Sequence, residues 1–163
     1  MLTDDQINRV WQGMLAAETR ALYFSDLATQ YTRRKQLITG LSFFLSSGAA
    51  ATIIARTPGW VPVVLSVVTA ALTAYSIAAG LDRKTSTMVK LASSWREITA
   101  AYDRLWNHAY DASASADLYK IMQSENAPSD LAATDGPPID EKRLDTWQQR
   151  VFRLHGLLKE NAA

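Results

Sequence analysis

Few residues of this chain are suited to covalent or acid–base chemistry. It has no cysteine and only two histidines, His108 and His155, which lie on different predicted helices. Asp111 follows His108 by one helical turn, but a metal site or a general base needs more converging groups than this pair provides. Asp140 and Glu141 are best explained as negative charge at a helix start, where the helix dipole favours it. The sequence also has no phosphate-binding loop, dinucleotide fingerprint or zinc-protease motif. We therefore predict no enzyme, no cofactor and no metal site, and the net charge of +1 gives no reason to expect a nucleic-acid partner.

Two rows of hydroxyl side chains are more informative, because they lie inside long uncharged segments. The residues follow one another at helical spacings of three and four: Thr39, Ser42 and Ser46 in the first row, and Ser66, Thr69, Thr73 and Ser76 in the second. One interpretation is close helix packing, in which small residues let membrane helices approach and hydroxyls bond back to their own backbone. The other is that the rows line a water-filled path when several copies assemble. No Asp, Glu, Lys or His lies within these segments, which argues against a pump or a secondary transporter.

The hydroxyl rows belong to residues 37–81, where Arg56 is the only charged residue. A turn at 56–60, with Pro58 and Gly59, divides this stretch into segments 37–55 and 61–81. Each is close to the roughly 20 residues that an α-helix needs to cross a bilayer, so we predict a transmembrane hairpin. A buried helix pair in a soluble domain is the alternative, but it does not explain the basic residues at the outer ends of both segments. These membrane-surface residues are Arg33, Arg34, Lys35, Arg83 and Lys84. Since positive charge favours the cytoplasmic side, we expect a multi-pass protein of the inner membrane with both termini in the cytoplasm.

Apolar residues at the same spacing continue from both segments into the rest of the chain. We expect a cytoplasmic N-terminal helix over 1–36, capped at Thr3 or Asp4 and continuous with the first span. A stalk helix is expected over 82–125, with a kink or break near 111–117, where Ser and Asp disfavour the helix. An antiparallel coiled coil would place Ala17 opposite Tyr102, in a register good to about one turn. The residues expected along this stalk seam are Phe24, Tyr31, Trp95, Ile98, Tyr102 and Leu105.

The remainder of the chain is predicted to be a loop followed by one more helix. Residues 126–138 are rich in Pro, Gly and Asp, which is typical of a loop. Residues 139–163 carry an apolar stripe and are predicted to form a C-terminal cytoplasmic helix that packs on the stalk as part of a bundle. No run of residues alternates as a half-buried strand would. We therefore predict an all-α protein.

Several of these features occur together in one known family. They are the segment 16–24 (AAETRALYF), the basic segment 31–35 (YTRRK), two spans with a Pro-Gly tip, and a long following helix with a Trp- and Tyr-bearing stripe. In this architecture residues 5–122 resemble the SLATT family of bacterial two-transmembrane effector domains, which are found with nucleotide-second-messenger synthases and SLOG-type sensors in antiphage and conflict systems. The resemblance implies a homo-oligomer in the inner membrane that disrupts the membrane on a signal from a cytoplasmic sensor or nucleotide-signalling partner. It implies no catalytic residues.

Two hypotheses of function follow. The first is a pore-forming effector in antiphage defence that oligomerises and permeabilises the membrane when it is triggered. The second is a constitutive, membrane-anchored coiled-coil scaffold that recruits a cytoplasmic partner through its terminal helix. Replacing the hydroxyl residues of the second span should abolish activity only in the first case.

Overall fold

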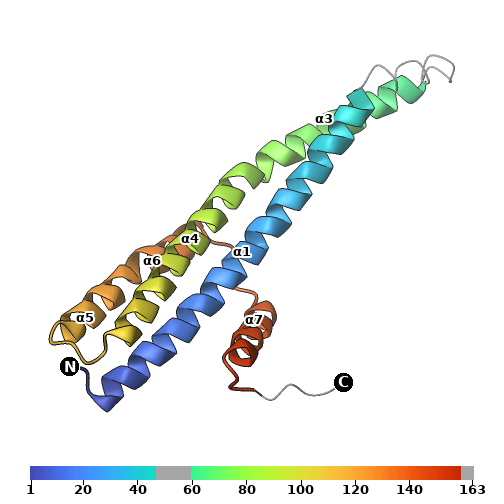
Figure 1. The fold of residues 1–163 in the computed structure, drawn as a ribbon. Helices are drawn as coiled ribbons and strands as arrows, with labels where there is room; N and C mark the ends of the chain where they lie inside the picture. The colour runs from blue at the N-terminus through green and yellow to red at the C-terminus, as the bar shows by residue number, and fades with distance from the viewer. Residues whose placement is uncertain (47–59, 159–163) are drawn as a thin grey trace. The chain divides into compact units, whose positions relative to one another are not determined.

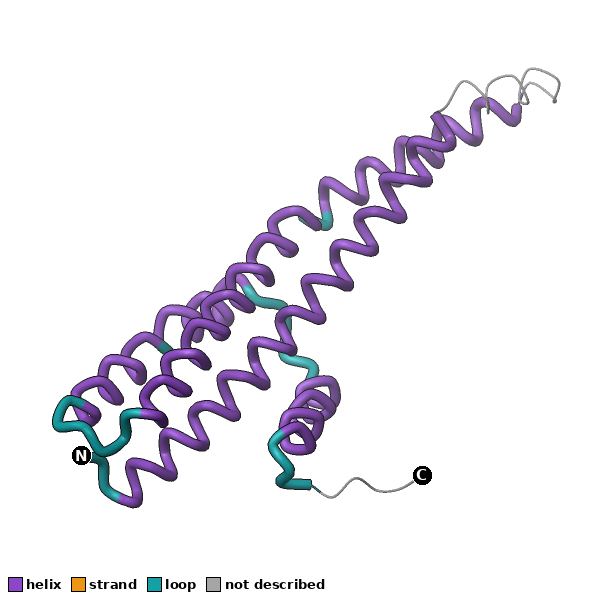
Figure 2. The backbone as a smooth tube through the Cα atoms, in the orientation of Figure 1, coloured by secondary structure: helices purple, strands orange, loops and turns teal. Residues whose placement is uncertain are grey.

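The computed structural model describes residues 1–46 and 60–158, and all secondary structure in this part of the chain is helical (Figures 1 and 2). The predicted all-α fold class is thereby confirmed. The helices are α1 (Asp4–Ser46), α3 (Trp60–Ala78), α4 (Leu81–Asn107), α5 (Ala114–Ser124), α6 (Asn126–Asp135) and α7 (Glu141–Leu154). The chain divides into two compact units: unit 1 consists of residues 1–27 and 87–163, and unit 2 of residues 28–86.

Helix α1 begins with a reciprocal cap. The backbone N–H of Gln6 donates to Thr3 Oγ1 (3.3 Å), and the backbone N–H of Thr3 donates to Gln6 Oε1 (3.0 Å). This capping box satisfies two backbone donors at the helix end, which decides between Thr3 and Asp4 as the cap. The helix is continuous to Ser46, as predicted for this part. Residues 47–55 of the first predicted span, and the turn up to residue 59, lie outside the described residues.

The second predicted span, 61–81, ends earlier than expected. Helix α3 stops at Ala78, and Gly80 adopts a left-handed conformation with φ +57°. The Gly80 N–H donates to the carbonyl of Ile77 (3.1 Å), one of the two bonds of a glycine-terminated helix. A new helix, α4, starts at once, since the Gly80 carbonyl accepts from the N–H of Lys84 (3.0 Å). The apolar spacing continues across this point, and only the glycine marks the interruption.

The stalk predicted over 82–125 consists of two helices, and the interruption expected near 111–117 is present. Helix α4 ends at Asn107, and α5 begins at Ala114 after a turn. The carbonyl of His108 accepts from the N–H of Asp111 (3.0 Å), and that of Asp111 accepts from the N–H of Ala114 (3.2 Å). Ser and Asp residues favour such turns over a continued helix, and the turn begins a few residues before the predicted position.

The predicted loop over 126–138 is also wrong for most of its length, because residues 126–135 form α6. Pro128 lies in the first turn of this helix, where its missing N–H has no intrahelical partner to lose, and its side chain is buried. Gly136 ends the helix in an extended conformation and starts the connection to α7.

The predicted C-terminal helix over 139–163 is shorter than expected and ends at Leu154. Asp140 caps its start, since its side chain accepts from the backbone N–H of Arg143 (3.1 Å). At its end Gly156 has φ +70°, its N–H donates to the carbonyl of Arg153 (3.0 Å), and the N–H of Leu157 donates to that of Phe152 (2.8 Å). These two bonds form a Schellman motif, which terminates a helix.

In unit 1 the first part of α1 packs against α4 in antiparallel orientation. The backbone N–H of Leu2 donates to the carbonyl of Ala109 (3.0 Å), and the rings of Trp11 and Trp106 lie 5.4 Å apart. The position on α4 falls as the position on α1 rises, as antiparallel packing requires. Tyr102 lies against Gly13, one turn before the predicted Ala17.

Unit 2 has a different character, because many of its described apolar side chains are exposed. Of the α3 residues whose side chains are described, none is buried. Val67 is 64% exposed and Ile77 is 76% exposed. One helical segment of the described chain, Val63–Asn107, is long and apolar enough to cross a membrane, and its apolar stretch contains no buried residue.

Candidate functional site

The second hydroxyl row runs along α3, and half of its residues are exposed. Ser66 and Thr73 are exposed, and Thr69 and Ser76 are half-buried. The Thr69 hydroxyl donates to the carbonyl of Leu65 (2.9 Å), and the Thr73 hydroxyl donates to the carbonyl of Thr69 (2.9 Å). Both donors are thus satisfied within the helix, while each oxygen keeps acceptor capacity. The row can therefore contact either water or a neighbouring helix without leaving an unpaired donor.

The first hydroxyl row is described only in part. Thr39 is exposed and Ser42 is half-buried on α1. Ser46 is the last residue of α1, and nothing is described of its side chain. The structure therefore gives a continuous hydroxyl row for α3 alone.

The basic residues at the membrane-surface positions are all exposed, namely Arg33, Arg34, Lys35, Arg83 and Lys84. Lys35 is also paired, because its ammonium group forms an ion pair with the carboxylate of Asp82. The sequence argument counted the cations of this region but not this acid. Asp82 neutralises one positive charge of the basic cluster. Its ion pair with Lys35 also connects α1 to the start of α4 within unit 2.

Most of the predicted seam residues are buried in unit 1: Phe24, Trp95, Ile98, Tyr102 and Leu105. Tyr31 belongs to unit 2 and is half-buried. The hydroxyl of Tyr102 donates to Glu125 Oε1 (2.8 Å), which links α4 to the junction of α5 and α6. Burial, together with this bond and the charge of Glu125, raises the pKa of Tyr102 well above its ordinary value.

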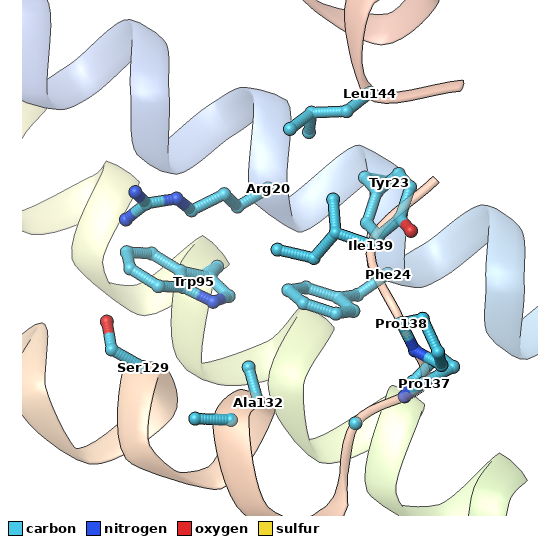
Figure 3. A pocket seen from close by; sticks show the side chains of 12 residues that line it. Arg20, Tyr23, Phe24, Trp95, Ser129, Ala132, Pro137, Pro138, Ile139 and Leu144 are labelled. Carbon is cyan, nitrogen blue, oxygen red and sulfur yellow. The ribbon is translucent and has the colours of Figure 1, made fainter. Parts of the chain in front are cut away.

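A cavity of about 570 Å³ opens among four helices of unit 1 and the connection from α6 to α7 (Figure 3). Helix α1 contributes Arg20, Tyr23 and Phe24, and α4 contributes Trp95. The cover comes from α6, the connection 136–139 and Leu144 of α7. Its volume falls in the range of small-molecule sites, which are mostly apolar with a few polar groups. The lining here has this composition.

Two polar groups of this cavity are notable. The Arg20 guanidinium carbon lies 4.5 Å from the centre of the Trp95 ring, a cation–π contact. No carboxylate of the described residues forms an ion pair with Arg20. Trp95 is only 1% exposed, and its indole nitrogen has no hydrogen-bond partner among the described residues. Such a buried donor normally has a partner, because leaving it unpaired costs about 1–3 kcal/mol.

Helix α7 is attached to α1 by a polar contact at each end. His155 Nε2 lies 2.7 Å from Glu18 Oε2, and the His155 ring stacks edge-on against Trp11 with centroids 5.4 Å apart. Near the start of α7, Asp26 accepts from Trp147 Nε1 (3.4 Å) and pairs with Arg143 (3.7 Å). These contacts hold α7 in place beside the cavity it helps to cover.

The two histidines therefore lie in different settings. His108 Nδ1 lies 3.5 Å from Asp111 Oδ2 in an exposed pair, and His155 is half-buried against Glu18. In the described part of the chain, no group of three or more His, Cys, Asp or Glu side chains is arranged to hold a metal ion.

No family model matches this chain, and no curated protein or solved structure matches it either. The functional argument therefore depends on the geometry of the molecule itself.

Sequence reasoning missed the cavity, although it had identified two of its residues. Phe24 and Trp95 were predicted as seam residues, but most of the cover lies in residues 129–138, which were predicted as a loop, and the rest is Ile139 and Leu144 of the predicted C-terminal helix. The available signal was Arg20, a cation that precedes the seam residue Phe24 by four positions and therefore lies on the same face of the helix. The contact of Glu18 with His155 had no comparable signal, because it joins positions 137 residues apart.

Proposed function

We propose that this protein is a membrane-anchored effector whose copies assemble and permeabilise the inner membrane in response to a signal, as in antiphage defence. The observation that carries the proposal is the uncovered apolar surface of α3. Burying a Val or Ile side chain is worth about 1.5–3 kcal/mol relative to leaving it in water. An apolar surface of this extent marks a membrane or protein contact site.

The membrane topology in this proposal is a hairpin that crosses twice, with both termini in the cytoplasm. The support comes from the exposed basic residues at its cytoplasmic ends, Arg33, Arg34, Arg83 and Lys84, and from the positive-inside rule. Unit 1 would then be the cytoplasmic part, and its antiparallel helices would continue the hairpin as a coiled coil. The resemblance to SLATT domains favours the same arrangement.

The hydroxyl row of α3 supports permeabilisation rather than anchoring alone. Since Thr69 and Thr73 already donate to their own helix, their oxygens can accept hydrogen bonds from water at no cost in unpaired donors. Several copies turned with this face inward would enclose a polar path. The face lacks ionisable groups, which suits a passive path rather than a pump.

The test is the membrane potential of bacteria, followed with a potential-sensitive dye after induced expression. We compare the wild type with the Ser66→Leu, Thr69→Leu, Thr73→Leu triple variant, and with a pair of isosteric changes, Thr69→Val and Thr73→Val. The control triple variant places Leu at Val67, Val68 and Ala71, other exposed positions of α3. We expect depolarisation by the wild type and by the control. Depolarisation should be clearly reduced for the Val pair and absent for the Leu triple variant.

Equal expression and membrane insertion of each variant are checked by fractionation. Because the two threonine donors bond only within their own helix, their replacement removes no tertiary hydrogen bond. Depolarisation by the Leu triple variant at the wild-type level would refute the pore-lining role of this face. If the wild type also fails to depolarise when its genomic neighbours are co-expressed, the effector function itself is wrong.

A second candidate function is the scaffold, and one observation favours it. At and just after the end of α7, Leu154 (68% exposed), Leu157 (50%) and Leu158 (43%) are uncovered apolar side chains. Such a group is suited to a protein partner. The scaffold predicts that Leu154→Ser with Leu157→Ser abolishes recruitment of a partner, while the potential stays unaffected by any change in the α3 hydroxyl row.

A further inference from the structure

The cavity of unit 1 has three properties that together describe a ligand. Its walls are mainly apolar and partly aromatic. Among the described residues, its one guanidinium has no acidic partner and its buried indole N–H has no acceptor. Figure 3 shows these groups around one space, with Arg20 above the Trp95 ring and Phe24 beside it. We propose that this cavity is a binding site for a small planar aromatic acid.

The anionic part of the ligand follows from Arg20. Its guanidinium is held by the Trp95 ring at 4.5 Å and no carboxylate of residues 1–46 or 60–158 neutralises it. A guanidinium presents parallel donors that match the two oxygens of a carboxylate, and its rigid shape reduces the entropy lost on binding. A carboxylate is therefore the group that this position recognises best.

The aromatic part follows from the walls. Phe24 is 6% exposed, Trp95 is 1% exposed, and Pro137 and Pro138 line the opposite side as rigid rings. Flat rings pack on such walls in offset or edge-on contacts, whereas a flexible chain loses more conformational freedom on ordering. An acceptor oxygen of the ligand near Trp95 Nε1 would also satisfy the donor that is left unpaired in the protein.

This proposal goes beyond the membrane function and does not depend on it. Binding is measured directly on the full-length chain in lipid nanodiscs, by equilibrium dialysis against nanodiscs without protein. The probes are 1-naphthoate, its neutral counterpart 1-naphthamide, which keeps the ring but lacks the charge, and decanoate as an aliphatic acid.

We expect saturable binding of one 1-naphthoate per chain, and binding of the amide and of decanoate at least about tenfold weaker, which corresponds to about 1.4 kcal/mol. Arg20→Gln should lower the affinity for 1-naphthoate about tenfold or more and remove the preference for the acid over the amide. Lys90→Gln, an exposed cation of α4 outside the cavity lining, is the matched control and should bind as the wild type does. Trp95→Phe should also lower the affinity for 1-naphthoate. The folding of this variant is checked by thermal unfolding.

Ala133→Leu serves as a second variant in case Trp95→Phe does not fold. Ala133 is exposed on α6 and lines the cavity, so the larger side chain should fill the opening without disturbing the core, and binding should be lost. The proposal is overturned if no saturable binding occurs up to about 1 mM, if acid and amide bind equally, or if Arg20→Gln leaves the affinity unchanged. Tighter binding of decanoate than of 1-naphthoate would refute the aromatic character of the site.

Discussion

Replacing Gly13 by alanine should destabilise unit 1, although the same change usually stabilises a helix. A Cβ atom at Gly13 would lie 2.6 Å from Cζ and 2.7 Å from the hydroxyl oxygen of Tyr102. Ordinary contacts between carbon atoms are about 3.5–4.0 Å, so the Tyr102 ring must move by about 1 Å. That ring is only 2% exposed, and its hydroxyl donates to Glu125 Oε1 at 2.8 Å.

The expected change in the free energy of unfolding combines two costs and one gain. Overpacking of a well-packed site costs about 1–3 kcal/mol. A weakened hydrogen bond to the charged Glu125 costs part of the roughly 1.5–3 kcal/mol of such bonds. Alanine gains about 1 kcal/mol over glycine in a helix interior. We therefore expect Gly13→Ala to lower the free energy of unfolding by about 1–3 kcal/mol.

The assay is urea unfolding of the full-length chain in nanodiscs, followed by near-ultraviolet circular dichroism. Ala16→Gly, at an exposed position of α1, calibrates the helix preference alone. In a Tyr102→Leu background the tyrosine ring is absent. The effect of Gly13→Ala on the free energy of unfolding should then change sign, so that the substitution stabilises the protein. Stabilisation by Gly13→Ala in the wild-type background would refute the close contact of Gly13 with Tyr102.

Three further outcomes are expected. Because the folded state favours neutral Tyr102, whose pKa is raised chiefly by burial and then by Glu125, the stability gained is fully present below about pH 10, the ordinary tyrosine pKa, and is lost as the pH rises above it. The free energy of unfolding, measured with urea, should thus fall more steeply above about pH 10 for the wild type than for Tyr102→Phe. Asp26→Asn removes the charge that Arg143 and Trp147 contact; since exposed pairs contribute about 0.2–1 kcal/mol, hydrogen exchange of α7 should accelerate by a few-fold and that of α5 should not change. Thr3→Ala removes one bond of the capping box and should cost about 1 kcal/mol, whereas Thr134→Ala on α6, whose hydroxyl only bonds back to its own helix, should cost less.

The sequence was sufficient for the fold class and for helix positions where the apolar spacing is long and unbroken, as in α1. It limited the cap of α1 to Thr3 or Asp4 without deciding between them, and it was sufficient for most of the seam, because burial of Trp95 and Ile98 follows from their helical spacing. It was insufficient where single residues end a helix. Gly156 stops α7 and Gly80 separates α3 from α4, and both adopt a left-handed conformation that the spacing of the apolar residues does not reveal.

Long-range packing explains the remaining errors. Residues 126–135 looked like a loop because of Pro128 and the nearby Asp residues, but a proline in the first turn permits a helix, and burial of Pro128 supports α6. The cavity could not be found by spacing alone, since it joins Arg20 and Trp95 to segments far along the chain. The pairing of Lys35 with Asp82 was missed for the same reason.

The contrast between the two units is the strongest argument about what surrounds this protein. The same spacing of apolar residues runs through α1 and α4 in unit 1, where Phe24 and Leu91 are buried, and through α3 in unit 2, where Val67 and Ile77 are exposed. A spacing that produces a buried face in one part needs a covering in the other, and that covering must come from outside the described chain. Lipid can cover apolar side chains but offers no partner to hydroxyls, whereas water or another copy can contact both Thr69 and Thr73. The isosteric Val replacements separate these cases, since they leave a lipid-facing surface undisturbed and alter only a surface whose hydroxyls contact water or a neighbouring copy.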